Sequence, residues 1–200
     1  GDSIAVGEPG RSNGEGVVYV YTRSGTSWSK EATITASNAD SLDYFGGEVA
    51  IENNTLAVGA YLEDSNQDTI TNGTTSSTNN DGDQTGAVYV YTRSGSTWTQ
   101  QAYIKAANPD DRDKFGEHIS LSEDTLAVGV PRERSTSTTT INGTTASSDN
   151  SESDVGAVYV YKRSGTSWTQ EAYIKAANSY QSTQFGTSVS LDTNTLRSEE

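Results

Sequence analysis

The chain has no cysteine, no methionine, three prolines and a single histidine, His118, among its 200 residues. Without cysteine it forms no disulfide, and it has neither a thiol nucleophile nor a histidine and cysteine cluster for zinc. Basic residues are scarce too, since 13 Lys and Arg stand against 27 Asp and Glu and leave a formal net charge of −14. Nucleic acid and anionic membranes repel such a chain, which argues against both as partners.

Long apolar runs are also missing, because no stretch approaches the roughly 20 residues of a membrane span, and we expect no membrane insertion. The hydrophobic content of 32% is too low for one large core, so we expect burial to come from many short strands. No signal peptide is visible. The chain opens on Gly1-Asp2-Ser3 in the middle of a repeat, so we expect any targeting segment to lie outside this sequence.

What the chain does have is an internal repeat with a period of seventy residues. Gly-Ala-Val-Tyr-Val-Tyr at 86–91 returns at 156–161, and Trp28, Trp98 and Trp168 are seventy residues apart. Over 23 positions from Gly86 and from Gly156, only four residues differ between the two copies. A fixed period above forty residues with short strands inside each unit is typical of propellers and stacked repeats.

Each unit contains four predicted strands. Alternating polar and apolar residues, tight polar turns and an apolar run without alternation place them at 115–121, 125–130, 156–163 and 168–176. The run 156–163 is rich in Val and Tyr on both faces, so we expect both of its faces to be covered. Four antiparallel strands of this length are too few to be stable alone, and each sheet must lie against its neighbours.

The residues that open and close these strands resemble FG-GAP repeats. Phe-Gly opens the first strand of each unit at 45–46, 115–116 and 185–186, and Val-Gly-x-Pro ends the second strand at 6–9 and 128–131. That family is similar to the repeats of integrin α chains and occurs in bacterial secreted and surface proteins. The resemblance implies an all-β propeller with blades of four antiparallel strands, serving adhesion or ligand recognition through loops on one rim.

The phasing of the repeats is circularly permuted, with units of approximately 1–52, 53–122 and 123–196 and about three blades' worth of strands. The count from the first strand at Ile4 to a last strand at 185–191 is twelve, because 196–200 abandons the Leu-Ala-Val-Gly pattern. Three blades leave the circle open and expose two apolar blade faces. We therefore expect that the chain is not a free monomer, and that another copy or further repeats complete the propeller. We also expect the three tryptophans to have similar, partly buried environments.

Integrin-type repeats often carry a calcium loop between the first two strands, but the corresponding turns here, such as 52–54 and 122–124, are too short to encircle an ion. We therefore do not carry that site over and expect no cofactor. Calcium binding remains an alternative at a second place, the acidic turns before Phe-Gly. These turns contain Asp40 and Asp43 or Asp110 and Asp113. In the purely structural interpretation, these carboxylates cap backbone N–H groups in Asx-type turns.

Two long polar excursions, 61–85 and 131–155, separate the second and third strands. Their composition is typical of a mobile, solvated loop. In the alternative interpretation they are recognition surfaces, because insertions at this point of successive blades emerge on the same rim. The sequons at Asn53, Asn72 and Asn142 fit the N-glycosylation pattern, and their use depends on a glycosylating host.

Catalysis has little support, so we expect no enzyme. His118 aligns with Glu48 and Ser188, which indicates a tolerated position, and the carboxylates that repeat sit in turns. The repeated tyrosines occupy blade-packing positions and are expected in the core. Three functions remain open: an extracellular or cell-surface module that binds a protein or glycan ligand, a structural subunit that self-assembles, and a carbohydrate-active enzyme with paired carboxylates.

Overall fold

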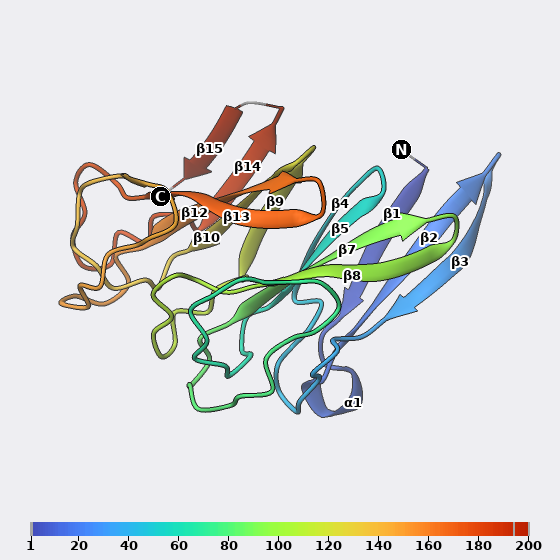
Figure 1. Ribbon diagram of the computed structural model, residues 1–200, viewed down its shortest axis with the longest axis horizontal. Coiled ribbons are helices and arrows are strands. Elements are labelled where there is room, and N and C mark those ends of the chain that lie inside the picture. Colours follow the sequence, from blue (N-terminus) through green and yellow to red (C-terminus); the bar gives the residue numbers. More distant parts are fainter. Residues whose placement is uncertain (1, 194, 200) are drawn as a thin grey trace.

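A computed structural model describes residues 2–193 and 195–199 and is almost entirely β, with 48% strand and 2% helix (Figure 1). The one helical segment in this described part is α1 (Arg11–Gly14), and no described helix is long and apolar enough to cross a membrane. The strands are β1 (Ser3–Glu8), β2 (Val17–Ser24), β3 (Ser27–Ile34), β4 (Glu48–Glu52), β5 (Thr55–Ala60), β6 (Thr71–Asn72), β7 (Ala87–Ser94), β8 (Thr97–Ile104), β9 (His118–Ser122), β10 (Thr125–Val130), β11 (Ile141–Asn142), β12 (Ala157–Ser164), β13 (Ser167–Ile174), β14 (Ser188–Asp192) and β15 (Thr195–Glu199).

The strands form antiparallel blades in the predicted order. Blade B has the order β4-β5-β7-β8-β6 and blade C the order β9-β10-β12-β13-β11, so that four long strands follow the chain and a two-residue fifth strand is added outside. Blade A contains β1-β2-β3, and β14 pairs with β15. The blade prediction is therefore confirmed. The predicted units 1–52 and 53–122 divide blade B between β4 and β5.

Strand three of each blade is covered on both faces, as its lack of alternation predicts. In β7, Val88 and Val90 pack toward blade C, whereas Tyr89 and Tyr91 pack toward blade A, and all four are buried. The aromatic face and the aliphatic face of neighbouring blades thus meet throughout the stack. This alternate burial explains why the repeated tyrosines of blades B and C are core residues.

The Phe-Gly pair joins each blade to the one before it. Phe115 is 1% exposed and packs edge-on against Tyr159 of its own blade, while its backbone forms a parallel bridge with Gly86 of blade B. The carbonyl of Gly116 faces Gly59, where a Cβ atom would overlap its oxygen, so this position admits only glycine. Gly7 with Gly46 and Gly129 with Gly186 repeat this contact.

Two expectations are wrong in detail. Residues Thr195–Glu199 do form a strand, β15, beside β14, although the Leu-Ala-Val-Gly pattern is lost. The tryptophans are also unlike one another, since Trp28 is 45% exposed, Trp98 is half-buried and Trp168 is fully buried. Figure 1 shows blade A and the β14–β15 pair on opposite sides of the molecule, so the described arc is open.

Candidate functional site

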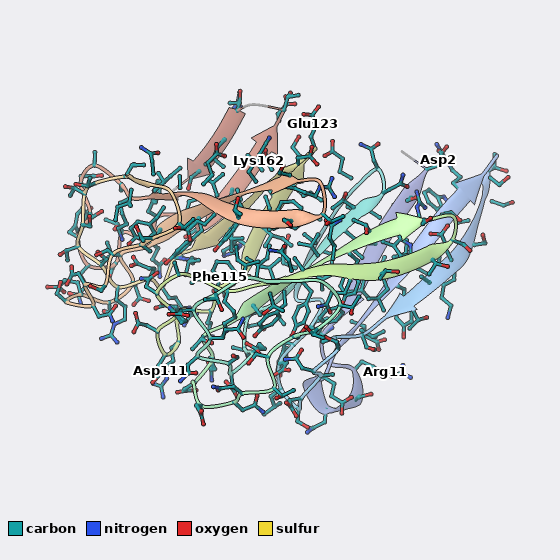
Figure 2. The ribbon with its side chains drawn as sticks, viewed as in Figure 1. Asp2, Arg11, Asp111, Phe115, Glu123 and Lys162 are labelled. Atoms are coloured by element: carbon teal, nitrogen blue, oxygen red, sulfur yellow. The ribbon has the colours of Figure 1, made fainter. Side chains whose placement is uncertain are left out.

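The long connections gather at one end of the molecule because the strands alternate in direction. Connections from strand two to strand three and from strand four to the next blade leave at this end, which we call the loop end. The short hairpins leave at the other, the hairpin end. Figure 2 shows Arg11 and Asp111 at the loop end and Asp2, Glu123 and Lys162 at the hairpin end. The rim predicted to carry recognition loops is therefore a single surface.

The excursions 61–85 and 131–155 have a defined conformation, which their composition does not predict. Strand β6 pairs with β8, and β11 pairs with β13 in the same register. Ser65 Oγ donates to Ser77 Oγ at 2.9 Å, and the equivalent Ser135 Oγ donates to Ser147 Oγ at 2.8 Å. The same bonds recur in both segments, so the two excursions share one hydrogen-bonded conformation, and their mobility in solution stays a prediction.

A buried ion pair anchors each excursion where it leaves strand two. Lys105 Nζ lies 2.9 Å from Glu63 Oε2 and also donates to the carbonyl of Gly86, and Tyr103 donates its hydroxyl to Glu63. Lys175 and Glu133 repeat the pair at 2.6 Å. Burial lowers the pKa of Lys105 and of Lys175, whereas the paired glutamate raises the pKa of each lysine and partly offsets the effect of burial. Glu63 and Glu133 are seventy residues apart, and each lies just after strand two. This repeat of a glutamate was the sequence signal for the buried ion pair, and the sequence analysis missed it.

In the first acidic turn before Phe-Gly, a buried carboxylate caps a backbone N–H group. Asp43 is buried, and its Oδ2 accepts the N–H of Asp40 at 3.0 Å. Asp113 is 2% exposed and sits in the equivalent turn after Asp110. Burial raises the pKa of Asp43 to about 7 and that of Asp113 to about 9, with Glu63 and Glu133 respectively adding repulsion. Backbone capping thus accounts for Asp43, whereas Asp40 accepts a hydrogen bond from the side chain of Asn80.

No group of three or more acidic or histidine side chains in residues 2–193 and 195–199 is placed to hold a metal ion. The turns between strands one and two are as short as expected, with β4 ending at Glu52 and β5 beginning at Thr55. The residues present therefore do not fit an integrin-type calcium loop. Calcium at Asp40, Asp43, Asp110 or Asp113 stays a prediction.

Side chains that differ between the repeats meet at the loop end where strand one begins, in a group we call the inner patch: Tyr44, Tyr61, Lys114, Glu117 and Arg132. The rings of Tyr44 and Tyr61 are 5.8 Å apart, and Lys114 Nζ lies 5.7 Å from the centre of the Tyr61 ring. Arg132 Nε lies 3.6 Å from Glu117 Oε2. Burial, with Glu117 nearby, raises the pKa of Tyr61. Aromatic faces, a cation and a carboxylate thus share one half-exposed surface.

The comparison with family models gives matches to the FG-GAP repeat at residues 28–91 and 98–161. Together they cover well over half of the chain. The chain belongs to the FG-GAP repeat family. Each match begins at a tryptophan of strand four and ends at a tyrosine of strand three in the next blade, so the FG-GAP model crosses a blade boundary. The comparison with curated proteins found no match.

The remaining predicted residues are spread over the FG-GAP blades. His118 is half-buried on β9 and faces Glu48 of β4, whose pKa is raised by burial and lowered somewhat by His118. Asn53 lies in the β4–β5 turn, Asn142 is exposed on β11, and Asn72 bonds through its side-chain amide to the backbone of Trp168. Glycosylation at these three sequons stays a prediction.

Proposed function

We propose that this FG-GAP chain is a non-catalytic binding module of an extracellular or cell-surface protein, and that it recognises a protein or glycan ligand at the loop end. The observation that carries the proposal is where the repeats differ. Strands three and four are nearly identical between the second and third copies, whereas the residues that flank Phe-Gly differ in all three. Tyr44, Lys114 and Gln184 occupy one such position.

In blades B and C the shared valines and tyrosines of strand three are accounted for by blade packing, because they are buried between blades at equivalent positions. The differing residues are half-exposed at the loop end and have no such role. A surface that varies on an otherwise uniform scaffold is the usual place for recognition, since loops carried by rigid strands supply specificity. The inner patch adds aromatic rings with an adjacent cation and carboxylate, a mixture suited to a ligand with both apolar and polar faces.

The excursions 61–85 and 131–155 extend the same surface. A hollow of about 300 Å3 lies beside the second excursion and is lined by Arg112, Arg132 and Arg134 together with Asp111, Ser153 and Asp154. Two of these arginines are already paired, Arg112 with Asp83 and Arg132 with Glu117, so the hollow presents both positive and negative groups to a ligand.

Glycan-array and cell-binding measurements on the purified chain test the proposal. We expect Tyr61→Ala and Lys114→Ala to weaken binding, because both remove part of the inner patch. Thr166→Ala changes an exposed residue in the β12–β13 hairpin at the opposite end and serves as the matched control. Binding that Thr166→Ala reduces as strongly as Tyr61→Ala would place recognition elsewhere. Polysaccharide turnover that is lost on substitution of a carboxylate would make the chain an enzyme.

A further inference from the structure

The contact between blades B and C contains an asparagine that binds the backbone of the next blade. Asn72 lies on β6 of blade B and faces Trp168, near the start of β13 in blade C. Its Oδ1 accepts the Trp168 N–H at 2.8 Å, and its Nδ2 donates to the Trp168 carbonyl at 3.2 Å. One side chain thus uses both halves of its amide on a single residue of the neighbouring blade. We call these two hydrogen bonds the latch.

Burial of the tryptophan follows the latch. Trp168 is fully buried, and its Nε1 donates to Gln101 Oε1 at 2.9 Å. Trp98 makes the same kind of bond to Glu31 of blade A at 2.8 Å but is only half-buried. Blade A has α1 where blade B has its excursion, so no described segment of blade A corresponds to β6. The latch and the excursion that carries it are therefore what the two junctions do not share.

Water reaches the latch from outside. Asn72 is exposed as a whole residue, although its amide is bonded to blade C. It lines a hollow of about 370 Å3 between the two blades, together with Ile70, Thr144 and Thr169. The latch is thus a closed contact at the edge of solvent, and a local opening would expose the amide fully.

Glycine follows Asn72 for a conformational reason. Gly73 has a φ of +117°, and a Cβ atom there would have no neighbour within 4 Å, so the backbone conformation alone favours glycine. The Gly73 N–H donates to the carbonyl of Gln101 at 2.7 Å. Gly143 repeats both features, with a φ of +106° and a bond of 2.7 Å to the carbonyl of Glu171. The turn that aims the asparagine at the next blade therefore creates an Asn-Gly pair.

An Asn-Gly pair is chemically reactive, because glycine has no side chain to hinder its own nitrogen. The Gly73 nitrogen loses its proton and attacks Cγ of Asn72, and Nδ2 leaves as ammonia. A five-membered succinimide ring remains. Water then opens the ring at either carbonyl and gives aspartate or isoaspartate. In sum, the amide and one water become a carboxylate and an ammonium ion, and no other reactant is needed.

The closed latch opposes this reaction in two ways. Both polar atoms of the Asn72 amide are bonded to Trp168, so the side chain must break both bonds before it can turn onto its own backbone. The attacking nitrogen is held as well, since the N–H of Gly73 is donated to Gln101. Deamidation therefore requires the contact between the blades to open first.

The products no longer fit the closed contact. Aspartate has an oxygen where Asn72 has Nδ2, and this oxygen faces the carbonyl oxygen of Trp168 without a proton between them. Isoaspartate lengthens the main chain of β6 by one carbon and moves the N–H of Gly73 away from Gln101. Either product leaves hydrogen-bonding groups at this junction without their partners.

We propose that Asn72 is the site of a deamidation that docked blade C suppresses and that, once it has occurred, keeps blades B and C from closing again. The site converts a transient opening of the contact into a permanent covalent change. Its lasting effect is exposure of Trp168 and of the hollow beside it, while the strands of each blade stay paired.

Peptide mass spectrometry of the purified chain, incubated folded and in concentrated urea at mildly alkaline pH, tests the protection. We expect Asn72 to deamidate at least about tenfold more slowly in the folded chain than in urea. Asn142 is the matched comparison, because the N–H of Gly143 is bonded as that of Gly73 is, whereas no described residue binds the amide of Asn142. In the folded chain of 200 residues, Asn142 should therefore react faster than Asn72.

Asn72→Asp, which installs one of the products, tests the opening. We expect the melting temperature to fall by at least about 3 °C, because the carbonyl of Trp168 loses its donor. With Trp28→Phe and Trp98→Phe in the background, Trp168 is the one remaining indole of the three in the chain, and its quenching by acrylamide should increase at least about twofold. Asn13→Asp adds the same charge at an exposed asparagine that also precedes glycine, and it should change neither quantity.

The unaltered chain supplies the product if Asn72→Asp does not fold. After deamidation in urea and return to buffer, molecules with an intact Asn72 should regain native quenching of Trp168, and modified molecules should not. Equal rates at Asn72 and Asn142 in the folded chain would overturn the protection by blade C. A melting temperature and a quenching constant that are the same for Asn72→Asp and Asn13→Asp would overturn the opening.

Discussion

At the scale of single residues, buried carboxyl groups are the most unusual feature of the fold. The third repeat has Thr183 where the second has Asp113, and the Thr183 hydroxyl donates to the carbonyls of Val155 and Tyr180. Asp113 Oδ1 is buried and has no hydrogen-bond partner among the described residues. A protonated Asp113 has a hydroxyl with which to donate, as Thr183 does. The packing therefore favours the neutral acid.

We expect the stability of the chain to fall as the pH rises from about 5 to about 9. Burial raises the pKa of Asp43 to about 7 and of Asp113 to about 9, so the folded chain holds these protons more tightly than the unfolded chain. The stabilisation is complete below the ordinary aspartate pKa and is lost as the pH passes the folded values, with a slope of up to about 1.4 kcal/mol per pH unit for each group.

Urea unfolding at pH 5, 7 and 9 measures this dependence. The groups around Asp113 are Glu133 and Asp110, which oppose its ionisation, and Arg134, which favours it. Asp113→Thr, which copies the third repeat, should flatten the curve above pH 7 because it removes the titrating group. A free energy of unfolding that rises with pH in the parent chain would contradict the assignment.

The buried Lys105–Glu63 pair gives a second prediction at this scale. Lys105→Met leaves Glu63 buried without its cation and should cost about 3–5 kcal/mol of unfolding free energy. Adding Glu63→Gln should recover part of the loss, because no uncompensated charge then remains. Lys30→Met changes an exposed lysine and should stay within about 0.5 kcal/mol in the same urea titration. A loss of equal size in both single variants would show that the pair has no special role.

At the scale of elements, close approach of backbones replaces side-chain packing at one point between successive blades. Gly59→Ala places a methyl group on the Gly116 carbonyl oxygen, and rigid backbone cannot move aside cheaply. We expect a loss of at least about 3 kcal/mol, above the usual range for overpacking. Gly10→Ala, with no atom within 4 Å of the new methyl group, is the control for thermal unfolding by circular dichroism. Equal melting temperatures for the two variants would exclude a tight contact at Gly59.

The sequence predicts the elements whose pattern is local. Strand two was predicted at 125–130 and is found at Thr125–Val130, because a short apolar run between polar turns has few alternatives. Strands β6 and β11 contain two residues each, too few for any periodicity, and they form because the buried Glu63 and Glu133 bring the excursions against strand four. β15 was missed because Leu196 is its one apolar residue and the strand has no alternation to detect, whereas its pairing with β14 is made by backbone hydrogen bonds.

At the scale of the whole molecule, the repeat in the sequence predicts the architecture. It does not predict how exposed an equivalent side chain is in each copy of the repeat. Trp28, Trp98 and Trp168 have similar local sequences and three different exposures, since a neighbouring blade supplies the contacts. The inner patch was missed for a similar reason. Tyr44 and Tyr61 belong to different connections, and only the antiparallel pairing of β4 with β5 brings them together. Residues at aligned positions that differ in every repeat were the available signal.

Calcium removal tests the molecule as a whole. We expect EDTA to change the melting temperature by less than about 2 °C, because the turns between strands one and two cannot surround an ion. A calcium ion that bound only the folded chain would raise the melting temperature, and its removal by EDTA would lower that temperature. Calorimetry with and without EDTA, followed by calcium or magnesium, measures the effect. A large drop that calcium restores and magnesium does not would identify the turns of Asp40, Asp43, Asp110 and Asp113 as sites.

The contact between the strand-two glycine and the next Phe-Gly carbonyl recurs at Gly7, Gly59 and Gly129 with the same partners in the same register. Because the backbone alone sets it, the distance from one blade to the next does not depend on which copy precedes or follows. A gene encoding such a chain can gain or lose a seventy-residue unit by recombination without needing compensating substitutions at the new junction. Copy number is then free to vary during evolution, while the loop-end residues of each unit diverge independently.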